Sequence, residues 1–154
     1  MAALIRGAAA PIFVLPALDG EAVSLLPLTR TVLLFFKSAC PTCRYAIPFF
    51  ERLYLTARGV KFLGISQDDT AKTREFVQRC GISFPVLIED APRYTASNAY
   101  GLTNVPTVFL VSAEGVVEFS SVGWARQDID GLSHRIARLP LFQPGEAVAD
   151  FKAG

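Results

Sequence analysis

Residues 31–43 read TVLLFFKSACPTC, an uninterrupted apolar run followed closely by two cysteines that are separated by two residues. A run of six apolar or β-branched residues between charged neighbours predicts a strand that is buried on both faces. From Cys43 to Ala57 the apolar residues recur at helical spacing, and a glycine two residues later ends the helix. The motif Cys40-Pro41-Thr42-Cys43 therefore lies where a buried strand passes into a helix.

This position predicts a chemical role for the motif. At a helix start, free backbone N–H groups and the positive end of the helix dipole stabilise a negative sulfur, here that of Cys40. Pro41 suits the first helical position, and Cys43 lies one turn inward, close enough to form a disulfide with Cys40. Lowering a cysteine pKa from about 8.5 to about 7 raises the thiolate fraction at pH 7 from roughly 3% to roughly half. Since a thiolate is the nucleophile in thiol–disulfide exchange, the motif predicts a redox-active disulfide.

Two other interpretations of the motif remain. A Cys-x-x-Cys pair is sometimes half of a zinc or iron–sulfur site, which needs a second pair of ligands. Cys80 and His134 are the other Cys and His residues, without ligand spacing, so we expect no metal and no permanently bound cofactor. Plain core cysteines are the second interpretation, which the strand-to-helix context disfavours. Cys80 itself is expected to be a buried apolar residue, and His134 a solvated one.

Strand and helix patterns alternate along the rest of the chain. Asp19-Gly20 and Glu114-Gly115 each lie between extended apolar runs and predict hairpins. Strand–helix–strand units followed by a hairpin and a helix indicate an α/β fold, a mixed central sheet with helices on both faces and an N-terminal β-hairpin. The segment 141–154 either packs back on the body or forms a flexible tail. We expect strands at 12–15, 22–25, 60–66, 86–88, 107–111 and 116–119, and helices at 70–80, 93–100 and 128–139.

Composition excludes several classes of function. The chain has 154 residues, of which 51% are hydrophobic and 19% charged, so we expect one folded domain with a substantial core. The net charge is +1 and no basic run is visible, so we expect no nucleic-acid partner. No stretch is a membrane span, and the first twenty residues lack a clean signal peptide. A cytoplasmic location is therefore expected, or a periplasmic one if a leader has been removed.

Several further motifs occur in order with the cysteine pair. The apolar strand ends in Phe35-Phe36-Lys37-Ser38-Ala39, Pro48 lies five residues after the second cysteine, and Val105-Pro106-Thr107 opens a late strand, with Gly115 and Gly123 following. With these motifs the chain resembles the thioredoxin superfamily, specifically its redoxin branch. That branch holds the TlpA-like thiol oxidoreductases and the alkyl-hydroperoxide-reductase/thiol-specific-antioxidant (AhpC/TSA) relatives. The resemblance covers roughly residues 12–139.

The resemblance implies a thioredoxin-like fold in a single domain over residues 1–154. Its parts are an N-terminal hairpin extension over 1–28, a core over 29–139 and a C-terminal tail over 140–154. Partners are expected to be protein or small-molecule thiols and disulfides, together with an upstream reductant or oxidant. The chain is expected to act as a monomer or weak dimer.

The resemblance also implies roles for residues far from the cysteines. Pro106 is expected to be cis and to face the two sulfurs, with an ordinary trans proline at a strand start as the alternative. The backbone of Val105 is expected to pair with an extended segment of the substrate. Trp124 follows Gly123 in a loop that this fold places near the sulfurs. It either offers an aromatic surface to the substrate or packs in the core.

The implied function is that of a thiol-disulfide oxidoreductase. Cys40 attacks a partner disulfide, and Cys43 resolves the mixed disulfide and leaves a Cys40–Cys43 bond. The alternative is a peroxiredoxin-like thiol peroxidase with antioxidant activity, in which a sulfenate forms at Cys40. Peroxiredoxins carry a proline and a threonine where this chain has Leu33 and Lys37, which favours the first function. A redox-sensing or binding domain without turnover is a third possibility that the sequence does not address.

Two departures from the family bear on the chemistry. Ala39 stands where the family often has a tryptophan, and Leu34 stands where thioredoxins carry a buried acid that relays a proton to the resolving thiol. The relay is then a water or another group. Asp68, Asp69 and Glu89 are candidates because they follow strands, and solvated loop carboxylates are the alternative for all three.

Overall fold

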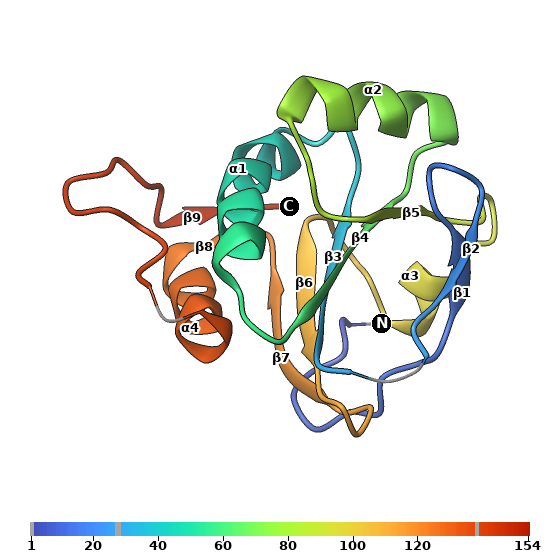
Figure 1. The fold of residues 1–154 in the computed structure, drawn as a ribbon, viewed down its shortest axis with the longest axis horizontal. Helices are drawn as coiled ribbons and strands as arrows, with labels where there is room; N and C mark the ends of the chain where they lie inside the picture. The colour runs from blue at the N-terminus through green and yellow to red at the C-terminus, as the bar shows by residue number, and fades with distance from the viewer. Residues whose placement is uncertain (1, 27–28, 138) are drawn as a thin grey trace.

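The computed structural model describes residues 2–26, 29–137 and 139–154, and its centre is a five-stranded sheet (Figure 1). The strand order is β5-β4-β3-β6-β7. Neighbours β3, β4 and β5 are parallel, whereas β6 is antiparallel to both β3 and β7. The predicted mixed sheet is therefore confirmed. Its strands are β3 (Thr31–Phe36), β4 (Lys61–Ser66), β5 (Val86–Ile88), β6 (Thr107–Val111) and β7 (Val117–Val122).

Four helices within the described ranges cover the two faces of this sheet. Figure 1 shows α1 and α4 on one face and α3 on the other, which confirms the predicted arrangement. Helix α2 begins after Asp69, whose side chain accepts the N–H of Lys72 at 2.8 Å, and it ends at Gly81 in the left-handed conformation. None of the described helices is long and apolar enough to cross a membrane. The helices are α1 (Pro41–Thr56), α2 (Thr70–Cys80), α3 (Thr95–Ala99) and α4 (Arg126–Ile136).

The predicted N-terminal hairpin is present. Strands β1 (Val14–Pro16) and β2 (Ala22–Ser24) pair in antiparallel fashion, and Gly20 takes a positive φ of 87° in the turn between them. A bridge between Ala17 and Leu87 attaches this hairpin to the β5 edge of the central sheet. The hairpin therefore covers the end of the sheet opposite to β7.

Some element bounds differ from those predicted. Helix α1 begins at Pro41 because Cys40 is the residue that caps it. Helix α3 spans only Thr95–Ala99, because Tyr94 before it has a left-handed backbone with φ 48°. Helix α4 begins two residues earlier than predicted, at Arg126. Strands β3, β5 and β6 and helix α2 have the predicted bounds.

The chain after α4 packs back on the body, which decides between the two alternatives left open for segment 141–154. Strand β9 (Phe151–Lys152) pairs with β8 (Trp124–Ala125) in antiparallel fashion. Figure 1 shows β9 and the residues after it passing beside α1. Neither two-residue strand is predicted from the sequence, because two residues carry no measurable periodicity.

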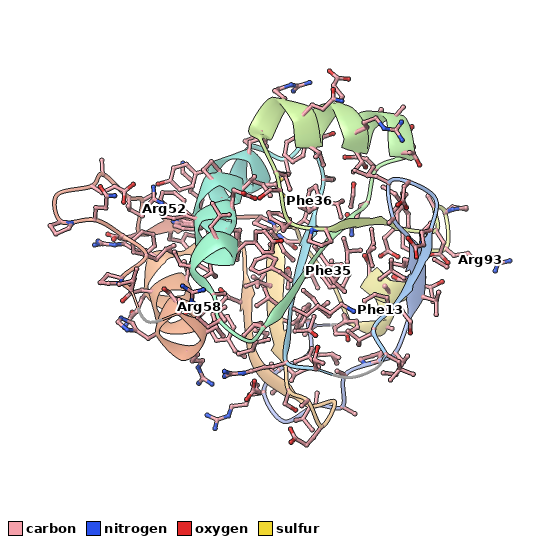
Figure 2. All side chains as sticks on the ribbon, in the orientation of Figure 1. Phe13, Phe35, Phe36, Arg52, Arg58 and Arg93 are labelled. Atoms are coloured by element: carbon pink, nitrogen blue, oxygen red, sulfur yellow. The ribbon has the colours of Figure 1, made fainter. Side chains whose placement is uncertain are left out.

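The core forms on both faces of β3, whose six residues are all buried. Phe35 packs against Tyr100 and Phe109 at ring distances of 5.6 and 5.8 Å, and Phe36 stacks on Phe76 at 5.6 Å. Figure 2 shows Phe35 and Phe36 among packed side chains, whereas Arg93 projects from the edge of the molecule. Such aromatic pairs stabilise a fold beyond the area they bury. The strand that leads into the cysteine motif is therefore a rigid support.

Candidate active site

Cys40 caps the N-terminus of α1. Its backbone is extended, with φ −89° and ψ 114°, and its Sγ accepts the N–H of Cys43 at 3.1 Å. Pro41 is the first helical residue, where its missing N–H leaves no helical hydrogen bond unmade. A negative charge on this sulfur would be stabilised by the N–H of Cys43 and by the positive end of the helix. The geometry at the helix start is that predicted from the motif.

The two cysteines differ in their surroundings. Both are free thiols, Cys40 with 7% of its surface exposed and Cys43 with none. Burial, followed by the neighbouring Cys40 sulfur, raises the pKa of Cys43 above that of an ordinary thiol. Cys43 is therefore held as a neutral thiol beneath Cys40, and it must lose its proton before it reacts.

The raised pKa of Cys43 predicts how the stability of the reduced protein depends on pH. Above about pH 8.5, the ordinary thiol pKa, the unfolded chain releases this proton while the folded chain keeps it. The free energy of unfolding is therefore expected to fall as pH rises from 8.5 to 10, measured by urea unfolding under reducing conditions. In Cys43→Ala the decline is expected to be shallower, whatever the stability of the variant at pH 7. Parallel curves for the two proteins would contradict the assignment.

The loop before β6 faces Cys40 from the other side. The main-chain oxygen of Val105 accepts the thiol of Cys40 at 3.4 Å, and the Val105–Pro106 peptide bond is cis. The N–H of Gly123 donates to the oxygen of Pro106 at 2.7 Å, which ties this loop to the end of β7. The structure thus brings the main chain of Val105 together with Cys40 across 65 residues of sequence.

A cavity of about 380 Å³ opens beside the Cys40 sulfur. Ala39 lines it in place of a larger side chain, and Lys37 brings a positive charge to its rim. A disulfide of a partner therefore has an approach to Cys40, whereas Cys43 lies deeper. The remaining lining residues are Pro41, Thr103, Asn104, Val105 and Gly154.

Trp124 does not offer an aromatic surface to a substrate, so that prediction is wrong. Its side chain is fully buried, and its indole N–H donates to the oxygen of Ala149 at 2.7 Å. The ring packs on Phe49 at 4.9 Å and against Tyr45 at 5.5 Å. A tryptophan with its single donor satisfied and its faces covered is a core residue, which was the alternative. It joins α1 to the C-terminal segment.

The three candidate carboxylates all have structural partners. Glu89 is buried and accepts the N–H of Ser97 at 2.7 Å together with the hydroxyl of that residue, so it stabilises the start of α3. Asp68 accepts the N–H of Ser38 at 2.6 Å and orders the loop that leads to Cys40. Asp69 caps α2. The solvated-loop alternative is therefore wrong for Glu89.

The remaining Cys and His residues lie outside the site. Cys80 is half-buried rather than buried, and burial still raises its pKa above that of an ordinary thiol. His134 is exposed and lies 3.4 Å from Asp130 on the same helix. In the described part of the chain, no three His, Cys, Asp or Glu side chains group as a metal site would require.

Sequence reasoning missed one part of the site. The hydroxyl of Thr42 donates to the oxygen of Ala153 at 2.5 Å, and the Nδ2 of Asn104 donates to the oxygen of Gly154 at 3.2 Å. The segment from 141 onward retains apolar residues, which indicates packing, but nothing in its sequence indicates where it packs. The structure brings it to the cysteine motif.

Comparisons with known proteins agree with this geometry. Residues 6–120 match the AhpC/TSA family. The chain is 31% identical to the thiol-disulfide oxidoreductase ResA of Halalkalibacterium halodurans over 124 residues, 77% of this chain and 69% of that protein. A structure assigned as the thiol:disulfide interchange protein DsbE of Chlorobium tepidum is 28% identical with a TM-score of 0.73, covering 86% of this chain and 95% of that one. StoA of Bacillus subtilis, 22% identical with a TM-score of 0.68 over 82% of this chain and 97% of that one, has the same fold.

These comparisons overturn the predicted cytoplasmic location. ResA, StoA and DsbE are extracellular or membrane-anchored, exported thiol-disulfide oxidoreductases. The prediction rested on the lack of a clean signal peptide in the first twenty residues, and the exported relatives overturn it.

Proposed function

This chain belongs to the AhpC/TSA family and is a thiol-disulfide oxidoreductase, in which we propose that Cys40 attacks the partner's disulfide and Cys43 resolves the mixed disulfide. The asymmetry between the two thiols carries the proposal. Cys40 lies at the helix start beside the cavity, whereas Cys43 is fully buried with a raised pKa. The substrates are protein thiols and disulfides, as the family implies.

The exchange has two steps. The Cys40 thiolate forms a bond to one partner sulfur, the partner S–S bond breaks, and the second partner sulfur leaves and takes up a proton. Cys43 then loses its proton and attacks the Cys40 sulfur, which releases the first partner sulfur as a thiol. Two electrons pass from the dithiol to the partner, and the Cys40–Cys43 disulfide remains. With the disulfide form as the starting point, the same steps run in reverse.

The loop opposite Cys40 holds the partner in this proposal. The main-chain oxygen of Val105 lies against the Cys40 sulfur, Pro106 follows it through a cis peptide bond, and the main chain of Val105 pairs with an extended partner segment. Pro41 fixes the helix start, and Thr42 presents its hydroxyl on the same side. These contacts orient the partner sulfur in line with Cys40.

The test is to trap the intermediate with Cys43→Ser. Without the resolving thiol, the first step is expected to proceed and the mixed disulfide at Cys40 to persist on non-reducing gels, with its linkage identified by mass spectrometry. Wild-type protein is expected to release the partner within the mixing time, and Cys80→Ser to behave as wild type. A mixed disulfide at Cys80, or the absence of any mixed disulfide, would contradict the assignment of Cys40 as the nucleophile.

We propose that residues 1–154 act as one thioredoxin-like domain that is monomeric or weakly dimeric. An upstream reductant or oxidant returns the Cys40–Cys43 pair to its starting redox state. The support for one domain is that the N-terminal hairpin bridges to β5 of the central sheet and that β9 pairs with β8 in a separate two-stranded sheet. Small-molecule disulfides are proposed to reach Cys40 through the same cavity of about 380 Å³. The peroxidase alternative is not favoured, because the relatives are thiol-disulfide oxidoreductases.

A further inference from the structure

Residues 148–154, here called the strap, run from the core to the cysteine motif. The strap is anchored at its start by Ala149. The N–H of Ala149 donates to the hydroxyl of Tyr45 at 2.8 Å, and the main-chain oxygen of Ala149 accepts the indole N–H of Trp124. It continues as strand β9 on the edge of β8. These contacts direct the following residues across the start of α1.

The end of the strap lies on the proposed partner site. Ala153 and Gly154 accept hydrogen bonds from Thr42 and Asn104 through their main-chain oxygens. Gly154 lines the same cavity as Cys40, and a Cβ placed on it would lie 2.5 Å from the oxygen of Val105. The strap therefore touches the residue whose main chain is proposed to pair with a partner.

The two halves of this C-terminal region are held unequally. Upstream of the strap, Arg52 binds Glu146 through two 2.9 Å hydrogen bonds, which lower the pKa of Glu146 to about 2. Figure 2 shows Arg52 on the side of the molecule where this region lies. By contrast, residues 151–154 are exposed, and Phe151 has 66% of its surface in solvent. Residues 151–154 are therefore the more exposed part of this region, and the residues upstream anchor it.

We propose that residues 151–154 occupy, within the same chain, the surface that an extended segment of the partner polypeptide must take before its disulfide reaches Cys40. The inference rests on the proposed function and names how that site recognises its partner. Thr42 and Asn104 bind main-chain oxygens, and the edge of β8 pairs with a main chain, so recognition tolerates many partner sequences. Release of the strap exposes all three features at once.

The first experiment compares the full chain with a chain that ends at Asp150. The reduced truncated protein is expected to reduce the disulfides of insulin about tenfold faster than the full chain, which corresponds to about 1.4 kcal/mol. Phe151→Ala in the full chain is the matched control and is expected to stay within twofold of wild type, because it leaves the main chain of the strap intact. Equal rates for the full and truncated chains would overturn the inference and leave the proposed function standing. No exchange by either chain would overturn the proposed function itself.

Asn104→Ala tests whether strap and partner share one surface. In the truncated chain it is expected to slow insulin reduction about fivefold, because the partner loses a hydrogen bond. In the full chain the substitution weakens the binding of the strap and the binding of the partner alike, so the rate of insulin reduction is expected to change less than twofold. If Asn104→Ala speeds insulin reduction by the full chain but does not slow it in the truncated chain, the strap and the partner bind separate surfaces. No effect in either would mean that Asn104 binds neither. Both results contradict the proposal.

A second measurement uses the full chain and does not depend on the truncated one folding. In the Cys43→Ser mixed disulfide with a protein partner, the amide hydrogen of Lys152, which faces β8, is expected to exchange at least about tenfold faster than in the free protein, because β9 has left β8. The amides of β6 serve as the internal control and are expected to stay protected. Unchanged exchange at Lys152 in the trapped complex would show that the partner binds without displacing the strap.

Discussion

Replacing Cys40 by serine is expected to reduce disulfide exchange at least about a thousandfold, to the level of the uncatalysed reaction. The serine hydroxyl occupies the same helix cap, so the fold is retained. It is not ionised at neutral pH and forms no mixed disulfide. The measurement is the rate of insulin reduction in the presence of a chemical reductant.

Two other cysteine variants serve as controls for this result. Cys80→Ser is expected to keep full activity, because Cys80 lies at the end of α2 outside the site. Cys43→Ser is expected to react once with a partner and then stop, because the first step needs only Cys40. Substantial turnover by Cys40→Ser would show that another sulfur is the nucleophile.

Trp124→Ala is expected to have the largest effect on stability, a loss of about 3–5 kcal/mol in the free energy of unfolding. The side chain is fully buried, and its ring packs on Phe49 and Tyr45 of α1. Its removal leaves a cavity and an unpaired oxygen on Ala149. Trp124 is the single tryptophan of the chain, so the variant has no tryptophan fluorescence. Its unfolding in urea is therefore best followed by circular dichroism.

Conservative and exposed replacements separate packing from the hydrogen bond. Trp124→Phe keeps an aromatic ring but loses the donor to Ala149, so a smaller loss of about 1–3 kcal/mol is expected. Phe151→Ala removes an exposed ring and is expected to change stability by less than about 0.5 kcal/mol. A loss for Trp124→Ala as small as that for Phe151→Ala would contradict the structural role given to the indole.

Local patterns predicted the elements that carry the nucleophile. After Thr31, β3 has no polar residue that could face solvent, so a central buried strand follows from the local pattern alone. Pro41 predicts the first turn of α1 because a proline at that position leaves no helical hydrogen bond unmade, whereas Pro48 lies inside the same helix and marks no boundary. Cys40 therefore has to be at or beside the helix cap. Each of these conclusions depends on residues within a few positions of one another.

Other conclusions failed where they depended on distant packing. Glu89 follows a strand like any loop carboxylate, yet it is buried because the start of α3 lies above it. Trp124 lies in a loop by its neighbours in sequence, and only the return of the chain at Ala149 covers it. The cytoplasmic location failed for a different reason, since no contact in the fold records a compartment.

The amino-acid sequence by itself determined the buried strand, the helix that follows it and the dithiol at their junction, because hydrophobic period, proline and capping act over one or two turns. Only the tertiary structure decided that Val105 faces Cys40, that Cys43 is fully buried and that the strap crosses the site. The contact between Thr42 and Ala153 joins residues 111 positions apart. Such a contact depends on how all the intervening elements pack, and no short segment of the chain specifies it.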